Sequence, residues 1–491
     1  MITHGGGPAI QIVGGFLAIY AWVPPNRTLR GAETTVNAAA RRFCPRPPAQ
    51  FAYPDWSTRR VSSTRSTTHP VATPLADAVM ARCEQLAGCS EEACRLTRRF
   101  LSPPMAEVHT LVAGWMRDAG LHTRVDDAGN LIGRLPVRGS AGPTNRTLLI
   151  GSHLDTVPGG GWYDGVLGVL VGLAAIEMLA EAGGGSSDGL PFNVDVIGFS
   201  EEEGVRFSKP YLGSAAMAGA FDAAWLDRVD EEGKTLRQAI ADFGLDADRL
   251  ADAAYDPGDV VGYLEPHLEQ GPVLDRAGSP VGLVSGIAGQ SRLRLAFHGE
   301  AGHAGTTPML GRHDALFCAS RFVRQVGRIG KRVDGLRATV GRMEVLPNAP
   351  NVIPARVNVS LDVRHIDDAV RERSIGELLA EARRIAGAEA CRFEVLEDAA
   401  QPAVAVDKHL SSVLGDAVSD CGHEPLRLPS GAGHDAVIMA SRFPVAMLFL
   451  RHPGGVSHHP DERVERDDVA VGIEAVSRFV HRLAERENAS A

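Results

Sequence analysis

The feature that most constrains the fold is a repeated order of apolar runs, polar loops and helices in the middle of the chain. Residues 148–150 are apolar and lead into Gly-Ser-His, and the apolar run at 192–200 leads into three acids. Between them, residues 165–182 form an Ala- and Leu-rich segment of helical length. Because strands that alternate with helices form parallel sheets, this order predicts an α/β domain with a mostly parallel sheet. In such sheets the active site lies beyond the carboxyl ends of the strands.

A second pattern begins near residue 286. Segments typical of strands occupy residues 291–298, 338–345, 356–365 and 391–396, and helical segments occupy 312–329 and 367–386. This β-α-β-β-α-β order predicts a ferredoxin-like domain. We interpret residues 286–398 as this small domain, inserted into a catalytic domain made of residues 75–285 and 399–491.

The first 70 residues differ from the rest of the chain. They contain eight arginines, no lysine and only two acids, and no helical or strand period persists in them. A transit-like extension is one interpretation, since such segments are Arg-rich and acid-poor. We favour a disordered tail or translated sequence upstream of the true start.

Composition excludes several classes of protein. The net charge of −10 gives no basic stripe for nucleic acid. The apolar run at 12–23 is shorter than the roughly 20 residues of a membrane span and has no basic segment before it, so neither a membrane anchor nor a signal peptide is expected. Seven scattered cysteines without a CxxC pair are typical of reduced thiols, which predicts a cytoplasmic protein.

The first polar cluster contains His153, Asp155 and Asp164. His153 and Asp155 are two residues apart, so on an extended segment both point the same way. Asp155 could then orient a metal-bound imidazole, and Asp164, on a Gly-rich loop, could bridge two metal ions. The structural alternative is a turn in which Asp164 caps the following helix.

The second cluster is the run of three acids at 201–203. Alone, such a run is usually a solvated loop. Metal cations would turn the repulsion between adjacent carboxylates into coordination, with one acid as a ligand and its neighbour as a general base.

Two further clusters place a histidine among acids, at 265–271 and 457–462. A lone histidine in either place would more often be structural. The case for metal chemistry rests on four such clusters in one chain.

These four clusters, together with the segments 96–104, 299–309 and 430–436, resemble the dinuclear-metal amidohydrolases of the hydantoinase/carbamoylase type. That family includes allantoate amidohydrolase, N-carbamoyl-L-amino-acid hydrolase and β-ureidopropionase, and the overall similarity is greatest to the first. The resemblance extends from about residue 75 to the C-terminus. It implies a metallopeptidase-like catalytic domain, and a small domain that serves in dimerisation or as a lid.

The resemblance also implies roles for individual residues. Two divalent ions per subunit, Zn²⁺ or Mn²⁺, would be held by five ligands: His153, Asp164 and His267 for one ion, and Asp164, Glu203 and His458 for the other. Glu202 would be the general base. His303 would reach across a homodimer interface to stabilise the oxyanion.

Substrate contacts are implied for Gln270, Asn351, Arg364 and His434. The fork of Arg364 suits a small carboxylate substrate, although a surface arginine at a strand end is the structural alternative. Two positions depart from the common family pattern. Pro266 precedes the third metal histidine, and His459 follows His458, which leaves the ligand assignment between these two histidines open.

The family resemblance predicts hydrolysis of a carbamoyl (ureido) C–N bond in allantoate, with release of ammonia and carbon dioxide. The alternative is an N-carbamoyl-L-amino-acid hydrolase or β-ureidopropionase. Two more distant alternatives are an aminoacylase or peptidase on the same scaffold, and a non-catalytic binding protein.

Overall fold

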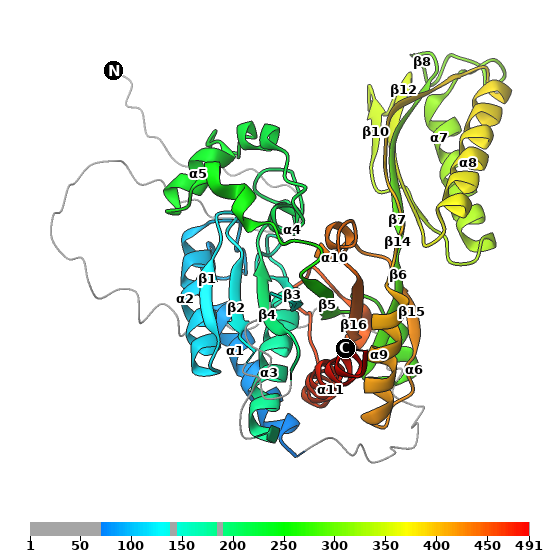
Figure 1. The fold of residues 1–491 in the computed structure, drawn as a ribbon. Helices are drawn as coiled ribbons and strands as arrows, with labels where there is room; N and C mark the ends of the chain where they lie inside the picture. Colours follow the sequence, from blue (N-terminus) through cyan, green and yellow to red (C-terminus); the bar gives the residue numbers. More distant parts are fainter. Residues whose placement is uncertain (1–69, 138–144, 184–189, 491) are drawn as a thin grey trace, which may run out of the picture. The chain divides into compact units, whose positions relative to one another are not determined.

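The computed structural model describes residues 70–137, 145–183 and 190–490, which form two main β-sheets with covering helices (Figure 1). The predictions made for residues 1–70 therefore fall almost entirely outside the described residues. No helix in the described ranges is long and apolar enough to cross a membrane.

Nine strands of the described residues form the large sheet. They are β1 (His122–Val125), β2 (Leu131–Leu135), β3 (Thr147–His153), β4 (Asn193–Phe199), β5 (Val260–Leu268), β6 (Val281–Ile287), β14 (Val404–Ala405), β15 (Arg427–Ser430) and β16 (Val445–Leu450). The order is β1-β2-β4-β3-β5-β16-β6-β14, and β15 pairs with β6. The predicted parallel sheet is confirmed at the centre, where β4, β3, β5 and β16 run parallel. On the flanks, β1 and β2 form an antiparallel hairpin beside β4, and β6 runs against β16 and β14 but parallel to β15.

Helices and short 3₁₀ turns accompany the large sheet. The helices are α1 (Ala72–Ala87), α2 (Pro103–Asp118), α3 (Val166–Gly183), α4 (Leu212–Met217), α5 (Leu236–Asp242), α6 (Val273–Ala277), α9 (Lys408–Asp420), α10 (Asp435–Met439) and α11 (Arg466–Ser490), and the 3₁₀ turns are η2 (Ala223–Asp227), η3 (Ala247–Ala253) and η4 (Pro453–Gly455). Helix α5 packs with η2 and η3 in a small cluster of its own. Helix α3 is apolar on nearly every side because it packs on β3 and β5 and is itself covered by α1 and α11.

The second sheet has five antiparallel strands in the order β10-β12-β7-β13, with β9 also paired to β12. Its elements are β7 (Gly289–His298), α7 (Ala315–Arg332), β9 (Arg337–Thr339), β10 (Met343–Leu346), β12 (Arg356–His365), α8 (Asp368–Ala388) and β13 (Arg392–Gln401). The chain order agrees with the predicted ferredoxin-like pattern. One predicted strand, 338–345, is instead split into β9 and β10 around Gly341, since glycine in a strand favours a break.

A short two-stranded ladder joins β8 (Gly302–His303) to β11 (Val352–Ile353). The second sheet and its two helices have an apolar core of their own, which includes Leu295, Phe322 and Leu361. We keep the predicted domain boundaries as a proposal.

Candidate metal centre

The polar clusters come from neighbouring elements of the large sheet. His153 is the last residue of β3 and His267 lies near the end of β5, which pairs with β3. Strand β4 leads directly into the acids 201–203, and β16 leads through η4 to His458. Since these four strands are parallel, their carboxyl ends meet at one edge of the sheet, where the sequence predicted the site.

Three imidazoles converge on Asp164. The Nε2 atom of His267 lies 3.3 Å from Asp164 Oδ1, and that of His458 lies 3.2 Å from Asp164 Oδ2. His153 Nε2 is 3.9 Å from Oδ1. Except for His458, which is half exposed, these side chains are buried, at 5% exposure or less. One carboxylate therefore lies between histidines from three different segments.

The other ring nitrogen fixes the orientation of two of these histidines. His153 Nδ1 lies 3.0 Å from the main-chain oxygen of Asp155, and His267 Nδ1 lies 2.9 Å from that of Leu268. Gly165 leaves room for the His153 ring: a Cβ at this position would lie 2.4 Å from the ring, and the residue has φ +68°. Metal-bound histidines commonly use this arrangement, with Nδ1 on a carbonyl and Nε2 towards the ion.

Asp155 connects the first two clusters. Its Oδ1 accepts a hydrogen bond from the main-chain N–H of Glu202 and its Oδ2 accepts one from that of Glu203, both at 3.1 Å. The carboxylate is farther from the His153 ring, at 3.7 Å. Asp155 thus holds the acidic loop, and its main-chain oxygen contacts the imidazole.

The three consecutive acids have different surroundings. Glu201 turns away from the histidines and accepts main-chain hydrogen bonds from Arg206 and Phe207. Glu202 and Glu203 instead group with His153, where their ligand atoms lie within 4.8 Å of one another. The chain thereby separates one supporting acid from two acids that face the candidate metal centre.

Burial and repulsion raise the proton affinity of these two acids. Burial, then Glu203 and Asp435, raise the pKa of Glu202 well above its usual range. Burial and Asp164 raise the pKa of Glu203 to about 7. The opposite holds at Asp164: burial opposes ionisation, but His458, His267 and His153 outweigh it and lower its pKa. A carboxylate that stays ionised among histidines suits a shared ligand.

The donor atoms fit divalent metal ions. His153, Asp164 and His267 form one group of potential ligands, and Asp164, Glu203 and His458 form another, each with its atoms within 4.8 Å. Imidazole nitrogen and carboxylate oxygen suit Zn²⁺ and Mn²⁺. Asp164 belongs to both groups, as a bridging carboxylate would.

The structure distinguishes the two adjacent histidines of the last cluster. His458 points to Asp164 and Glu203, with its Nε2 3.6 Å from Glu203 Oε1. His459 is exposed and pairs with Asp461. His458 has a left-handed backbone, with φ 56°, as do Glu201 and Gln270. Non-glycine residues in this conformation are strained and tend to occur at functional sites.

Two predicted substrate residues lie beside the histidine cluster. Gln270 donates from Nε2 to both carboxylate oxygens of Asp164, at 3.1 and 3.2 Å. The His434 ring packs edge-on against His267, with centroids 4.5 Å apart, and its Nε2 lies 2.8 Å from Ser430 Oγ.

Arg364 is the next-to-last residue of β12, and its guanidinium already has partners. Its Nε and Nη2 donate to the carboxylate of Asp362, and its Nη1 donates to the main-chain oxygen of Gly431. His303 is the last residue of β8 and Asn351 immediately precedes β11, and the Ala304 N–H donates to the main-chain oxygen of Asn351. His303 Nδ1 accepts main-chain hydrogen bonds from residues 305 and 306. Among the described residues, His303 is in none of the metal-ligand groups.

Arg98 is a buried residue to which sequence reasoning gave no role. Its Nε donates to the Leu154 oxygen and its Nη1 to the oxygens of Leu86 and Cys89. Its own main chain exchanges hydrogen bonds with Thr156. The guanidinium thus holds the segment between His153 and Asp155. Its position inside the 96–104 motif was the one available signal.

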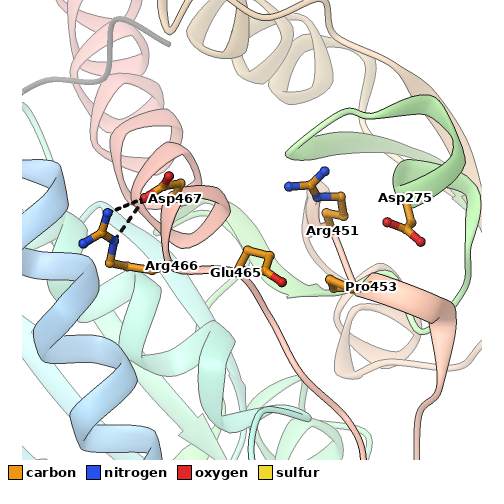
Figure 2. Close-up of a pocket in the computed structure, with 6 residues that line it drawn as sticks. All are labelled: Asp275, Arg451, Pro453, Glu465, Arg466 and Asp467. Atoms are coloured by element: carbon orange, nitrogen blue, oxygen red, sulfur yellow. Dashed lines mark hydrogen bonds and ion pairs between the residues drawn. The ribbon is translucent and has the colours of Figure 1, made fainter. Parts of the chain in front are cut away.

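The pocket drawn in Figure 2 is separate from these residues. It has a volume of about 470 Å³ and is lined by Asp275, Arg451, Pro453, Glu465, Arg466 and Asp467. Arg451 is paired with Asp468, and Arg466 with Asp467. None of the predicted site residues lines it, so we do not assign the chemistry to this pocket.

Fold and site together describe an α/β scaffold with a candidate metal centre at the carboxyl ends of its parallel strands. Residues 149–482 match peptidase family M20/M25/M40, and the chain belongs to that family. It is 38% identical to an allantoate deiminase of Arabidopsis thaliana, over 83% of this chain and 82% of the plant protein. It is equally identical to an N-carbamoyl-L-amino acid amidohydrolase of Geobacillus stearothermophilus, over 80% and 94%.

Solved structures agree with this assignment. An amidase of the hydantoinase/carbamoylase family from Burkholderia multivorans superposes with a TM-score of 0.76 at 31% identity, over 84% of this chain and 98% of that one. The predicted family and the predicted metallopeptidase-like fold are therefore confirmed.

Proposed function

We propose that the protein hydrolyses the carbamoyl (ureido) C–N bond of a small carboxylate substrate, with allantoate as the first candidate. The observation that carries this proposal is the convergence of three imidazoles on Asp164, with the buried Glu202 beside them. The similarity to an allantoate deiminase and to a carbamoyl-amino-acid amidohydrolase supports the choice of bond.

Two divalent ions, Zn²⁺ or Mn²⁺, are proposed per subunit. His153, Asp164 and His267 would hold one, and Asp164, Glu203 and His458 the other. When bound, such ions polarise the ureido carbonyl and lower the pKa of water towards neutrality.

Glu202 is the proposed general base. Its carboxylate is buried and lies in one group with His153 and Glu203, beside the candidate metal centre. It takes a proton from the attacking water and passes it to the leaving nitrogen, while the water oxygen bonds to the ureido carbon. One water and one carbamoyl group give one ammonia, one carbon dioxide and the freed amine.

His303 is proposed to donate a hydrogen bond to the developing oxyanion, from the second subunit of a homodimer. Gln270, Asn351 and His434 are proposed to contact substrate. Arg364 is proposed to bind its carboxylate. Three N–H groups of Arg364 already donate, and because arginine has five, two remain for this purpose.

The test is ammonia release from allantoate and from several N-carbamoyl-L-amino acids, with the protein loaded separately with Mn²⁺ and Zn²⁺. Glu202→Gln serves as the matched inactive control. Preference for allantoate supports the first candidate and identifies the metal. Preference for a carbamoyl amino acid keeps every proposed catalytic role and changes the substrate.

No release from either compound would contradict the proposed bond. A panel of N-acetyl amino acids and dipeptides would then test the aminoacylase or peptidase alternative. Failure of the purified protein to bind metal would favour the non-catalytic alternative.

A cytoplasmic location and a homodimer remain part of the proposal. Light scattering tests the dimer directly, and an active monomer would contradict the proposed role of His303 across an interface.

A further inference from the structure

Glu462, the last acid of the fourth cluster, has a buried side chain that the proposed reaction does not use. Its Oε1 accepts hydrogen bonds from the main-chain N–H groups of Tyr163 and Asp164, each at 3.0 Å. Its Oε2 accepts one from Ser457 Oγ at 3.3 Å. The side chain is 5% exposed. Glu462 therefore joins the loop of Asp164 to the loop of His458.

The network around Glu462 closes on the carboxylate of Asp164. Ser457 Oγ lies 3.2 Å from Gln270 Nε2, which also donates to both Asp164 oxygens. Asp164 is thus held at its main chain by Glu462 and at its side chain by Gln270. A connected network of this kind restricts a ligand more than either hydrogen bond alone.

Gly161 makes room for this arrangement. A Cβ at residue 161 would lie 2.3 Å from both the Cδ and Oε1 atoms of Glu462, closer than packed atoms come. The segment 161–164 can therefore approach Glu462 only with glycine at its first position. An alanine there would displace the carboxylate while leaving its chemistry intact.

We propose that Glu462 is a positioning residue of the metal centre, which fixes Asp164 against the loop that carries His458. This proposal rests on the metal roles of Asp164 and His458 proposed above. Its physical basis is geometric: a shared ligand must meet two groups of donors at once, and Asp164 belongs to both groups. Partners that orient metal ligands typically contribute about 10–100-fold to metal affinity.

The test is a metal titration of the full chain after removal of metal with a chelator. Zn²⁺ affinity is measured by competition with a chromophoric chelator, and folding is measured by circular dichroism. We expect Glu462→Ala to bind Zn²⁺ about 10–100-fold more weakly than wild type. Glu462→Gln should stay within a few-fold of wild type, because its amide oxygen still accepts both N–H groups.

Gly161→Ala provides an independent variant, since it moves Glu462 without altering it, and it should weaken Zn²⁺ binding like Glu462→Ala. Asp314→Ala is the matched control. Asp314 also accepts two main-chain N–H groups, at the start of α7, and its loss should lower the melting temperature and leave Zn²⁺ affinity unchanged.

Wild-type Zn²⁺ affinity in both Glu462→Ala and Gly161→Ala would overturn the positioning role of Glu462 and leave the proposed metal centre unaffected. A Glu462→Gln affinity as low as that of Glu462→Ala would also overturn it, because charge rather than hydrogen-bond geometry would then matter. If Glu462→Ala does not fold, the Gln and Gly161 variants decide. Absence of Zn²⁺ binding in the wild-type protein would instead overturn the proposed metal centre, and this role with it.

Discussion

The two main sheets of the molecule treat their side chains differently. Every residue of β3 and β4 in the large sheet is buried, because helices and loops cover both faces. In the second sheet, β12 alternates regularly between buried and half-exposed residues, because helices cover one face. Parallel and antiparallel sheets commonly differ in this way.

The charged residues follow the same division. At the edge of the large sheet, His153, Asp155 and Asp164 are buried together. On the open face of the second sheet, Arg294 pairs with Glu397 in solvent. Because burying charge costs free energy unless it is compensated, the large sheet retains a charged cluster only if something compensates it, and metal ions would. We therefore expect the metal chemistry in the first region, while the second region contributes only the proposed substrate contacts of His303, Asn351 and Arg364.

The largest effect is expected from substitution of two adjacent acids that follow β4, Glu202 and Glu203. Glu202→Gln should lower kcat about 10²–10⁴-fold and keep metal, since it removes only a general base. Glu203→Gln should lose both activity and bound metal, since it removes a proposed ligand. Ammonia release and metal content by atomic absorption measure both variants. Equal metal loss in the two variants would contradict the assignment of Glu202 as a base and Glu203 as a ligand.

Substitution in the apolar core of the second sheet should lower the stability of the protein and leave metal binding unchanged. Leu295 is fully buried at the centre of β7. Leu295→Ala should lower the free energy of unfolding by about 2–5 kcal/mol because it leaves a cavity. Urea unfolding measures this loss. Zn²⁺ affinity should not change, and a large change in affinity would show that the two regions are not separate in function.

His303 is one of the residues of the second region to which we propose a function. His303→Ala should lower kcat about 10²–10³-fold with metal retained, as removal of an oxyanion donor does. His313→Ala is the control, since His313 is a partly exposed histidine beside Glu300 on the same unit. Steady-state kinetics of both variants measure the effect, and near-normal turnover by His303→Ala would contradict its proposed role as an oxyanion donor.

The smallest effect is expected on the open face of the second sheet. Arg294→Ala breaks an ion pair whose members are both more than half exposed. Such pairs contribute about 0–1 kcal/mol, so the unfolding midpoint should hardly move. Thermal melts at low and high salt measure the effect. A shift comparable to that of Leu295→Ala would mean that this face is covered by a partner.

Sequence predicted those parts of the fold in which polarity changes abruptly. Strands β3 and β4 were predicted because apolar runs lead directly into polar loops. Strand β5 was not predicted, because its interior contains Glu265, Pro266 and His267 and does not look like a central strand. The structure tolerates Pro266 since the ladder to β3 ends at Leu264, so the missing N–H costs no bond there.

The site was predictable as a set of residues but not as a geometry. The family resemblance named the residues that the structure brings around Asp164. It could not choose between His458 and His459, because that choice depends on the backbone of one loop. Nor could it show that Asp362 pairs with Arg364, or that Arg98 is buried behind the site. Such contacts join residues through three-dimensional packing and leave no pattern in the order of the residues.

The hydrogen bonds of Arg98 limit how far the chain can be shortened from its N-terminal side. The match to the peptidase family begins at residue 149, and every proposed ligand lies inside it. The guanidinium that holds the strand end at His153 lies outside it, and so do the carbonyls of Leu86 and Cys89 that complete its hydrogen bonds. A chain shortened to residues 149–482 would keep every proposed metal ligand and lose the hydrogen bonds of Arg98 that hold the end of β3. We therefore expect the smallest working unit to extend further towards the N-terminus than the family match does, and to include α1, which supplies the carbonyl of Leu86.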